Sequence, residues 1–389
     1  MVNDVGFSWG MPPLVLYGKG CVSRVGEAIK QLEGKRALLV TDAILLKSGQ
    51  ADEIKNLLRQ SGICLEIFSG VDREPEDVHV EEGLKIFKAS SCDSIIALGG
   101  GSCIDAAKGI GLMSTNPGKL ADYEGNGKVK FKSAPLVAIS TTAGTASEIS
   151  RSAIITDTRR TVKMAIRDEK IRPTVAVCDP LLTVSLPPSV TASSGMDALI
   201  HAIEGYVSRA CQPMTEMVAL RAVELISQSL PVAFVNGKDL DARTDMMLGQ
   251  LLGGMSFSNA STCLVHGMAK PVGANFHVPH GLSNAMFIAD VMEYTLAACP
   301  QKYAKIAQAM GESIAGLTVN EAAEKSVAFV RKLCKTVKVP SIVEYGIDRE
   351  KYLQLVPQLA EDCIANKGHE MNPRTPSKQE LIALYKQMV

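Results

Sequence analysis

The first half of the chain alternates short apolar runs with longer stretches of helical periodicity. The apolar runs lie at 36–42, 63–68, 94–98, 135–139 and 174–178. The helical stretches lie at 22–32, 48–61, 76–90 and 103–114. Because buried strands alternating with helices are typical of βαβ units, this pattern predicts a parallel sheet with helices on both faces. Two strand-like pieces at 152–156 and 162–166 flank a polar turn and predict a hairpin.

The pattern changes after the Leu186-Pro187-Pro188 sequence, where strand-like runs stop. Amphipathic stretches then predict helices at 194–208, 215–230, 242–258, 282–297, 301–314, 319–336, 350–364 and 378–388. Since the two prolines resist helix continuation, a domain boundary is expected near residue 185. We therefore predict an α/β domain over 1–185 with a parallel, Rossmann-like sheet and an all-α domain over 186–389. The active site is expected in the cleft between the two domains.

Composition narrows the range of partners. Lys+Arg and Asp+Glu both number 41, and no basic stripe favours nucleic acid or a membrane surface. A small neutral or singly charged molecule is the expected partner. The chain has no secretory signal pattern, and no apolar run is expected to be long enough to cross a bilayer. Its ten cysteines include no C-x-x-C pair. These features favour a cytoplasmic protein with reduced thiols.

The carboxyl ends of parallel strands are the expected ligand-binding edge of such a sheet. Asp42 follows the first predicted strand. A carboxylate at this place can accept hydrogen bonds from the ribose hydroxyls of NAD and repel the 2′-phosphate of NADP. It can equally be the N-cap of the next helix.

A glycine-rich turn, Gly99-Gly100-Gly101-Ser102, ends another strand and opens a helix that contains Asp105. Glycines allow close approach of a ligand, and the helix N-terminus favours an anion such as a pyrophosphate. The sequence is neither G-x-G-x-x-G nor a P-loop, and a tight strand-to-helix turn is the simpler alternative.

A third strand end, 140–148, is rich in serine and threonine and includes Thr141 and Thr142. Its hydroxyls can donate hydrogen bonds to phosphate, ribose or nicotinamide, although serine and threonine are also common in ordinary turns. The position beyond a parallel strand favours binding.

Four of the six histidines fall between residues 193 and 280: His201, His266, His277 and His280. Asp197 precedes His201 by four residues, so both side chains project from one helix face. A lone histidine on such a helix is usually a hydrogen-bonded core residue. The constellation instead predicts a divalent metal held by Asp197, His201, His266 and His280, with His277 close to the chemistry. These donors accept Fe²⁺, Zn²⁺, Mn²⁺, Co²⁺ or Ni²⁺.

Five segments together resemble the iron-containing alcohol dehydrogenases, the group typified by bacterial lactaldehyde and propanediol oxidoreductases. They are 12–27, the GGGS-x-x-D turn at 99–105, AGTASE at 143–148, the PP-x-x-TA-x-x-GMDA-x-x-H segment within 187–208, and HGMA with H-x-PHG at 266–281. The resemblance implies hydride transfer between NAD(H) and a short-chain alcohol or aldehyde. It makes the four metal-binding residues Fe²⁺ ligands and surrounds NAD with Asp42, Gly99, Gly100, Ser102, Asp105, Thr141, Thr142 and Lys163. A homo-oligomer, a dimer or larger, is also expected.

One position departs from the family pattern. Many members have a histidine four residues after the third ligand, where this chain has Lys270. This leaves His277 as the better candidate for proton relay. A lysine in the metal pocket can pair with an acidic head group on the substrate, or it can extend along the rim with its charge in water.

Two other classes remain open from sequence. A glycerol-dehydrogenase-like or dehydroquinate-synthase-like protein also uses NAD and a metal. The phosphorylated substrate of the latter requires clustered basic residues, which the segment 193–280 lacks. A non-catalytic metal-binding or assembly protein is less consistent with a complete ligand set beside a nicotinamide-type loop.

Overall fold

The computed structural model describes residues 6–72, 74–160 and 162–389. The chain forms two compact units. The α/β unit comprises residues 10–142 and 146–184. The helical unit comprises 185–389 together with residues 6–9 and 143–145. The three residues 143–145 thus belong to the helical unit, although the chain on either side of them belongs to the α/β unit.

Six strands of the α/β unit form one parallel sheet in the order β1-β9-β6-β4-β2-β3. The predicted parallel sheet is confirmed. Its strands are β1 (Leu14–Tyr17), β2 (Arg36–Val40), β3 (Cys64–Phe68), β4 (Ser94–Gly99), β6 (Leu136–Ser140) and β9 (Val175–Cys178).

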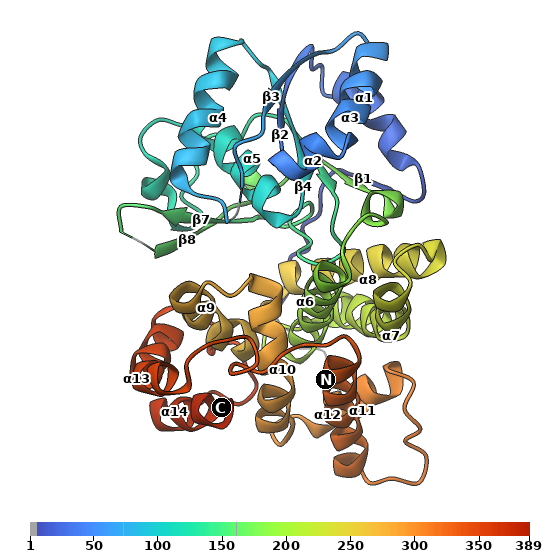
Figure 1. Ribbon diagram of the computed structural model, residues 1–389, viewed down its shortest axis with the longest axis vertical. Coiled ribbons are helices and arrows are strands. Elements are labelled where there is room, and N and C mark those ends of the chain that lie inside the picture. The colour runs from blue at the N-terminus through green and yellow to red at the C-terminus, as the bar shows by residue number, and fades with distance from the viewer. Residues whose placement is uncertain (1–5, 73, 161) are drawn as a thin grey trace. The chain divides into compact units, whose positions relative to one another are not determined.

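Successive side chains of a strand point to opposite sides of the sheet. Because these side chains are apolar on both sides, helices cover both faces. Leu38 and Val40 of β2 pack in one core cluster with the helices α4 (Asp77–Ala89) and α5 (Gly101–Thr115). Ala37 and Leu39 pack in the other cluster with α1 (Val25–Gln31) and α3 (Gln50–Gln60). Figure 1 shows these helix pairs on the two sides of the sheet. The continuous apolar runs therefore reflect burial on both faces.

The predicted hairpin is also present. The strands β7 (Ser152–Asp157) and β8 (Val162–Arg167) pair antiparallel, and the two-residue strand β5 (Gly125–Asn126) adds to β8 in parallel. The short helices of this unit are α2 (Ala43–Lys47), η1 (Cys21–Arg24), η2 (Leu120–Tyr123), η3 (Glu169–Ile171) and η4 (Pro180–Thr183).

A buried lysine joins α5 to the segment that leads into β7. Lys108 is 1% exposed, and its ammonium group lies 3.2 Å from Asp105 Oδ1 and 2.7 Å from Ser147 Oγ. It also donates to Ser150 Oγ and to the carbonyl of Ser152. Burial lowers the pKa of Lys108, and Asp105 opposes that effect. Every donor of the ammonium group is satisfied, so the buried charge is tolerated.

The second half of the chain is helical, as predicted. Its helices are α6 (Pro188–Val207), α7 (Pro213–Val235), α8 (Leu240–Asn259), α9 (Leu264–Phe276), α10 (His280–Leu296), α11 (Pro300–Ala309), α12 (Val319–Thr336), α13 (Arg349–Ala365) and α14 (Lys378–Gln387).

Two features of these helices differ from the expectation. The helix α6 starts at Pro188, because proline is well suited to the first helical position, whereas residue 194 was predicted. The helix α9 was not predicted at all. Gly267, Pro271 and Gly273 interrupt its apolar pattern, and burial of its first nine residues except Lys270 shows that packing stabilises it.

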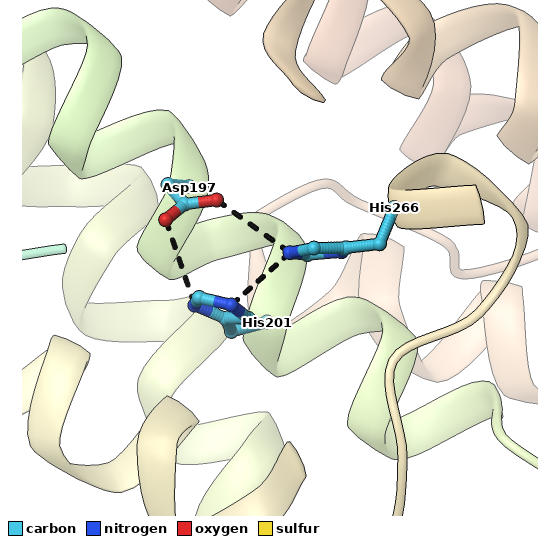
Figure 2. Close-up of side chains that lie close together, drawn as sticks. All are labelled: Asp197, His201 and His266. Atoms are coloured by element: carbon cyan, nitrogen blue, oxygen red, sulfur yellow. Dashed lines mark hydrogen bonds and ion pairs between the residues drawn. The ribbon is translucent and has the colours of Figure 1, made fainter. Parts of the chain in front are cut away.

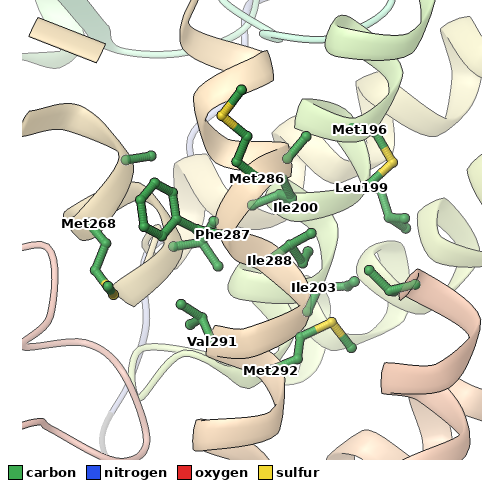
Figure 3. Close-up of a cluster of buried hydrophobic side chains, with 14 of the residues drawn as sticks. Met196, Leu199, Ile200, Ile203, Met268, Met286, Phe287, Ile288, Val291 and Met292 are labelled. Carbon is green, nitrogen blue, oxygen red and sulfur yellow. The ribbon is translucent and has the colours of Figure 1, made fainter. Parts of the chain in front are cut away.

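The core of the helical unit centres on α6. Apolar side chains of α6, α9 and α10 interdigitate there, including Leu199, Ile203, Met268, Phe287 and Val291 (Figure 3). Most of α6 is buried on every side. Polar side chains on this helix are consequently enclosed by the fold and need partners within it.

The expectation that no segment could cross a bilayer was wrong for α7 by length and composition. This helix has 23 residues, and an 18-residue window within it has a mean hydropathy of 1.5. Half of that window is buried by packing inside the unit. Central helices of globular folds have the same character, so the feature is weak evidence for a membrane segment.

We expect Lys108→Met to destabilise the α/β unit by about 3–5 kcal/mol, because it leaves the Asp105 carboxylate buried without its cation. Calorimetry should show a fall of about 10 °C in the corresponding melting temperature. The double variant Lys108→Met/Asp105→Asn should lose less, since both charges are removed together. A double variant no more stable than the single one would contradict this interpretation.

Candidate metal and cofactor sites

The helix α6 presents three acidic or basic side chains on one buried face. Asp197, His201 and Glu204 are separated by four and three residues, which brings them to the same side of the helix. Each side chain is at most 5% exposed. A carboxylate, an imidazole and a second carboxylate therefore lie together inside an apolar core, where unpaired charge is costly.

His266 of α9 completes a compact group with Asp197 and His201 (Figure 2). Its Nε2 lies 3.1 Å from His201 Nε2 and 3.7 Å from Asp197 Oδ1. One donor atom from each residue falls within 4.8 Å of the others. A metal bond of about 2.1 Å separates neighbouring donors by about 3–3.5 Å, so these spacings are close to those of a coordination shell.

The hydrogen bonds of the two imidazoles indicate where their protons lie. His266 Nδ1 is 2.6 Å from Glu204 Oε2, and His201 Nδ1 is 3.4 Å from the carbonyl oxygen of Gly144. With each ring protonated on Nδ1, both contacts are hydrogen bonds donated to an oxygen acceptor. The two Nε2 lone pairs then face each other across 3.1 Å. A cation between them relieves that repulsion, and the residues present therefore fit a metal.

The protonation states also suit metal binding. Burial lowers the pKa of His201, and it lowers that of His266 well below the usual value. Burial alone would raise the pKa of Asp197, but the imidazoles of His201, His280 and His266 hold it below the usual value. Neutral imidazoles and an ionised carboxylate are the forms that coordinate metals.

His280 lies at the edge of this group, on the first turn of α10. Its Nε2 is 3.8 Å from Asp197 Oδ1, and its side chain is 37% exposed. Asn284, one turn later, places its side-chain nitrogen 2.8 Å from Asp197 Oδ1 and 3.2 Å from His280 Nε2. A side chain at Gly281 would meet the carbonyl of Ser193 at 2.4 Å. Glycine there lets α10 approach α6 beside Asp197.

Sequence reasoning missed Glu204 and Asn284. Glu204 follows His201 by three residues, and Asn284 follows His280 by four, so both share a helix face with a predicted ligand. That spacing was the available signal. Burial raises the pKa of Glu204 to about 7, against the lowering effect of backbone hydrogen bonds at Cys263, Val265 and His266.

The two candidate catalytic residues lie on α9 and just after it. Lys270 is half-buried one turn beyond His266, and its charge contributes to the lowered pKa of His266. His277 ends α9 in a left-handed conformation with φ of 54° and is exposed. Neither residue is among the three that converge in the buried group.

On the α/β unit, Asp42 and the glycine turn come together. Asp42 is the N-cap of α2, and its Oδ1 accepts from the amide of Leu45 at 2.8 Å. Its Oδ2 lies 3.9 Å from the Cys103 thiol, at the start of α5. The N-cap alternative is therefore correct for one oxygen, while the second faces the turn that begins α5.

The glycine turn packs closely against Cys103 and Thr142. Gly99 has φ of 158°, and a side chain there would meet Cys103 at 2.6 Å. A Cβ at Gly100 would lie 3.4 Å from the methyl group of Thr142, whose hydroxyl is buried and makes no hydrogen bond within the described part of the chain. Ser102 is half-buried in the first turn of α5. These groups can bind an anion at the helix N-terminus.

Three other predicted cofactor residues have protein partners. Asp105 accepts from Lys108 and Ser147 through Oδ1 and from the amide of Ile154 through Oδ2. Lys163 forms an ion pair with Glu74 at 2.9 Å. Thr141 donates its amide to the carbonyl of Gly99 at 3.0 Å. The Asp105 carboxylate thus holds the serine- and threonine-rich segment in place.

Comparison with known proteins shows the family. Residues 12–180 match the profile of iron-containing alcohol dehydrogenases, and residues 191–389 match the C-terminal profile of the same family. The chain is 39% identical over 377 residues to the NAD-dependent methanol dehydrogenase of Bacillus methanolicus, covering 97% of this chain and 98% of the relative. It is 39% identical over 384 residues to the 1,3-propanediol dehydrogenase of Klebsiella pneumoniae, covering 98% of each.

The fold agrees with these sequence matches. The crystal structure of a 1,3-propanediol oxidoreductase superposes with a TM-score of 0.96 at 39% identity, covering 99% of this chain and all of that one. The resemblance inferred from the sequence motifs is confirmed. This chain belongs to the iron-containing alcohol dehydrogenase family of NAD-dependent oxidoreductases.

Proposed function

We propose that this chain transfers a hydride between NAD(H) and a short-chain alcohol or aldehyde at a divalent metal, with Fe²⁺ as the expected ion. The proposed ligands are Asp197, His201, His266 and His280. The observation that carries the proposal is the approach of the two imidazole Nε2 atoms to 3.1 Å, with the buried Asp197 carboxylate 3.7 Å from one of them. When bound, the metal supplies positive charge that stabilises alkoxide character on the reacting oxygen, worth several kcal/mol.

The side chains of this centre would have separate tasks. Asp197 contributes the negative charge of the ligand set, and the neutral imidazoles complete it without adding charge. His277 is the proposed proton-relay residue, since it is exposed and can exchange a proton between the reacting hydroxyl and solvent. Its place immediately after α9 keeps it on the same chain segment as His266.

We propose that NAD binds at the carboxyl ends of β2, β4 and β6. The amides at the start of α5, with Gly99, Gly100 and Ser102, would hold the pyrophosphate. Asp42 Oδ2, whose contact in the protein is the Cys103 thiol at 3.9 Å, would accept from a ribose hydroxyl, and the Thr142 hydroxyl would donate to the cofactor. Asp105 would act by holding the segment that contains Thr141, while Lys163 would reach the cofactor only by leaving Glu74.

Short substrates are favoured by the relatives named for methanol and 1,3-propanediol. The half-buried Lys270, one turn from His266, favours a substrate with an acidic head group.

A cytoplasmic location and a homo-oligomeric state are proposed as well. The free cysteines at all ten positions are consistent with the first of these.

We expect His201→Ala and His266→Ala to abolish both metal retention and turnover. Each variant removes one nitrogen donor from the proposed ligand set. Metal content after dialysis and NADH absorbance with short aldehydes would measure the two effects. His79→Ala, which changes a histidine in the α/β unit, is the matched control. Full activity in either metal-depleted variant would contradict the proposal.

We expect Asp42→Ser to raise kcat/KM for NADPH relative to NADH by about tenfold or more. Serine preserves an N-cap acceptor for α2 while the negative charge that repels a 2′-phosphate is lost. Steady-state kinetics with both cofactors would measure the ratio, and melting temperature would check that α2 is intact. An unchanged ratio in a stable variant would remove Asp42 from the ribose site.

We expect Lys270→Ala to lower kcat/KM for acidic aldehydes relative to neutral ones by about 10- to 100-fold, the loss of one charge-assisted hydrogen bond. Lys270→Arg should retain most of the preference because it keeps the charge. Lys305→Ala, which removes an exposed lysine paired with Glu216, is the control. If the ratio is the same in Lys270→Ala and the wild type, the lysine lies at the rim and does not select the substrate.

A further inference from the structure

Glu204 uses both carboxylate oxygens within the protein, and both contacts reach the start of α9. Its Oε1 accepts from the amide of Val265 at 2.7 Å, and its Oε2 lies 2.6 Å from His266 Nδ1. The side chain is 3% exposed. A carboxylate in this setting is held by two donors that lie on consecutive residues of another helix.

We propose that Glu204 is a positioning residue that fixes the tautomer and orientation of His266 toward the metal. The inference rests on the proposed function, because it assigns the purpose of the contact to metal binding. Glu204 does not touch the reacting atoms. It acts by keeping the proton of His266 on Nδ1, so that the Nε2 lone pair faces Asp197 and His201.

The Glu204 carboxylate also acts as a hydrogen-bond acceptor for the first turn of α9. The N-cap residue of α9, Cys263, makes no side-chain cap hydrogen bond. The first amides of a helix have no partner within it, and the helix dipole favours negative charge at that end. Glu204 supplies from α6 the acceptor that α9 lacks, so the cap of the helix and the orientation of the imidazole depend on one side chain.

This arrangement makes α6 the common support of three donors. Asp197 and His201 project directly from α6, and Glu204 on the same face holds His266. The spacing among the three donor groups is then set by one helix, which is more rigid than three independent loops. The contact explains why a second acidic side chain is buried next to the ligand set.

Glu204→Gln tests this proposal because the side chain keeps its shape but loses one of its two acceptor oxygens. Glutamine has a single side-chain oxygen and a donating NH₂ group, whereas Val265 and His266 both donate. If the oxygen stays on Val265, the NH₂ group faces His266 Nδ1 and favours the tautomer with its proton on Nε2, inside the site. If the amide flips, the cap of α9 is lost instead.

The experiment compares wild type, Glu204→Gln and the control Glu216→Gln, whose carboxylate contacts Tyr206 and Lys305. Metal-free proteins are titrated with Co²⁺ and followed by its visible absorption. In parallel, ¹⁵N-histidine NMR of the metal-free proteins reports the tautomer of His266, identified by its loss in His266→Ala. Six histidines keep the spectrum simple.

We expect a wild-type His266 with its proton on Nδ1, a loss of about 10- to 100-fold in Co²⁺ affinity in Glu204→Gln, and wild-type behaviour in Glu216→Gln. A folded Glu204→Gln with wild-type affinity would overturn the inference. A proton on Nε2 in the wild type would overturn it even if the variant does not fold. If the wild type binds no Co²⁺, the proposed function fails, while the tautomer of His266 still decides the role of Glu204.

Discussion

The helical unit depends on one electrostatic constraint, the burial of an ionised carboxylate in an apolar core. Asp197 is 1% exposed, and removing such a charge from water costs several kcal/mol unless partners compensate it. Asn284 donates one hydrogen bond, and the imidazoles of His201, His266 and His280 surround the remainder. The packing of α6, α9 and α10 brings these groups together, so the stability of the core and the chemistry of the site have the same origin.

The α/β unit also contains a buried charge, but this one is positive. Lys108 is a buried cation whose side-chain partners, Asp105 and the hydroxyls of Ser147 and Ser150, lie beside the proposed cofactor site. Its hydrogen bonds join α5 to the segment that leads into β7. In both units, then, a buried charge with several partners lies at or beside a proposed site.

Features with a local physical cause were predictable from the sequence. Apolar runs predicted the strands because those strands are buried on both faces, and the hairpin at 152–167 followed from alternating residues around a polar turn. The pattern failed at α9, where Gly267, Pro271 and Gly273 lower helix propensity and packing compensates. It also placed the start of α6 six residues late, since Pro187-Pro188 was taken as a barrier although proline suits the first turn.

The sequence by itself determined that Asp197 and His201 share a helix face, because that relation needs only 3.6 residues per turn. It also singled out the family motifs and the glycine turn. Only the tertiary structure decided which group contacts each imidazole, since His266 meets Glu204 across 62 residues of chain. The tertiary structure likewise decided that the Asp105 carboxylate contacts Lys108 and Ser147 within the protein. Such contacts depend on how helices pack, and packing is a property of the whole core rather than of any local spacing.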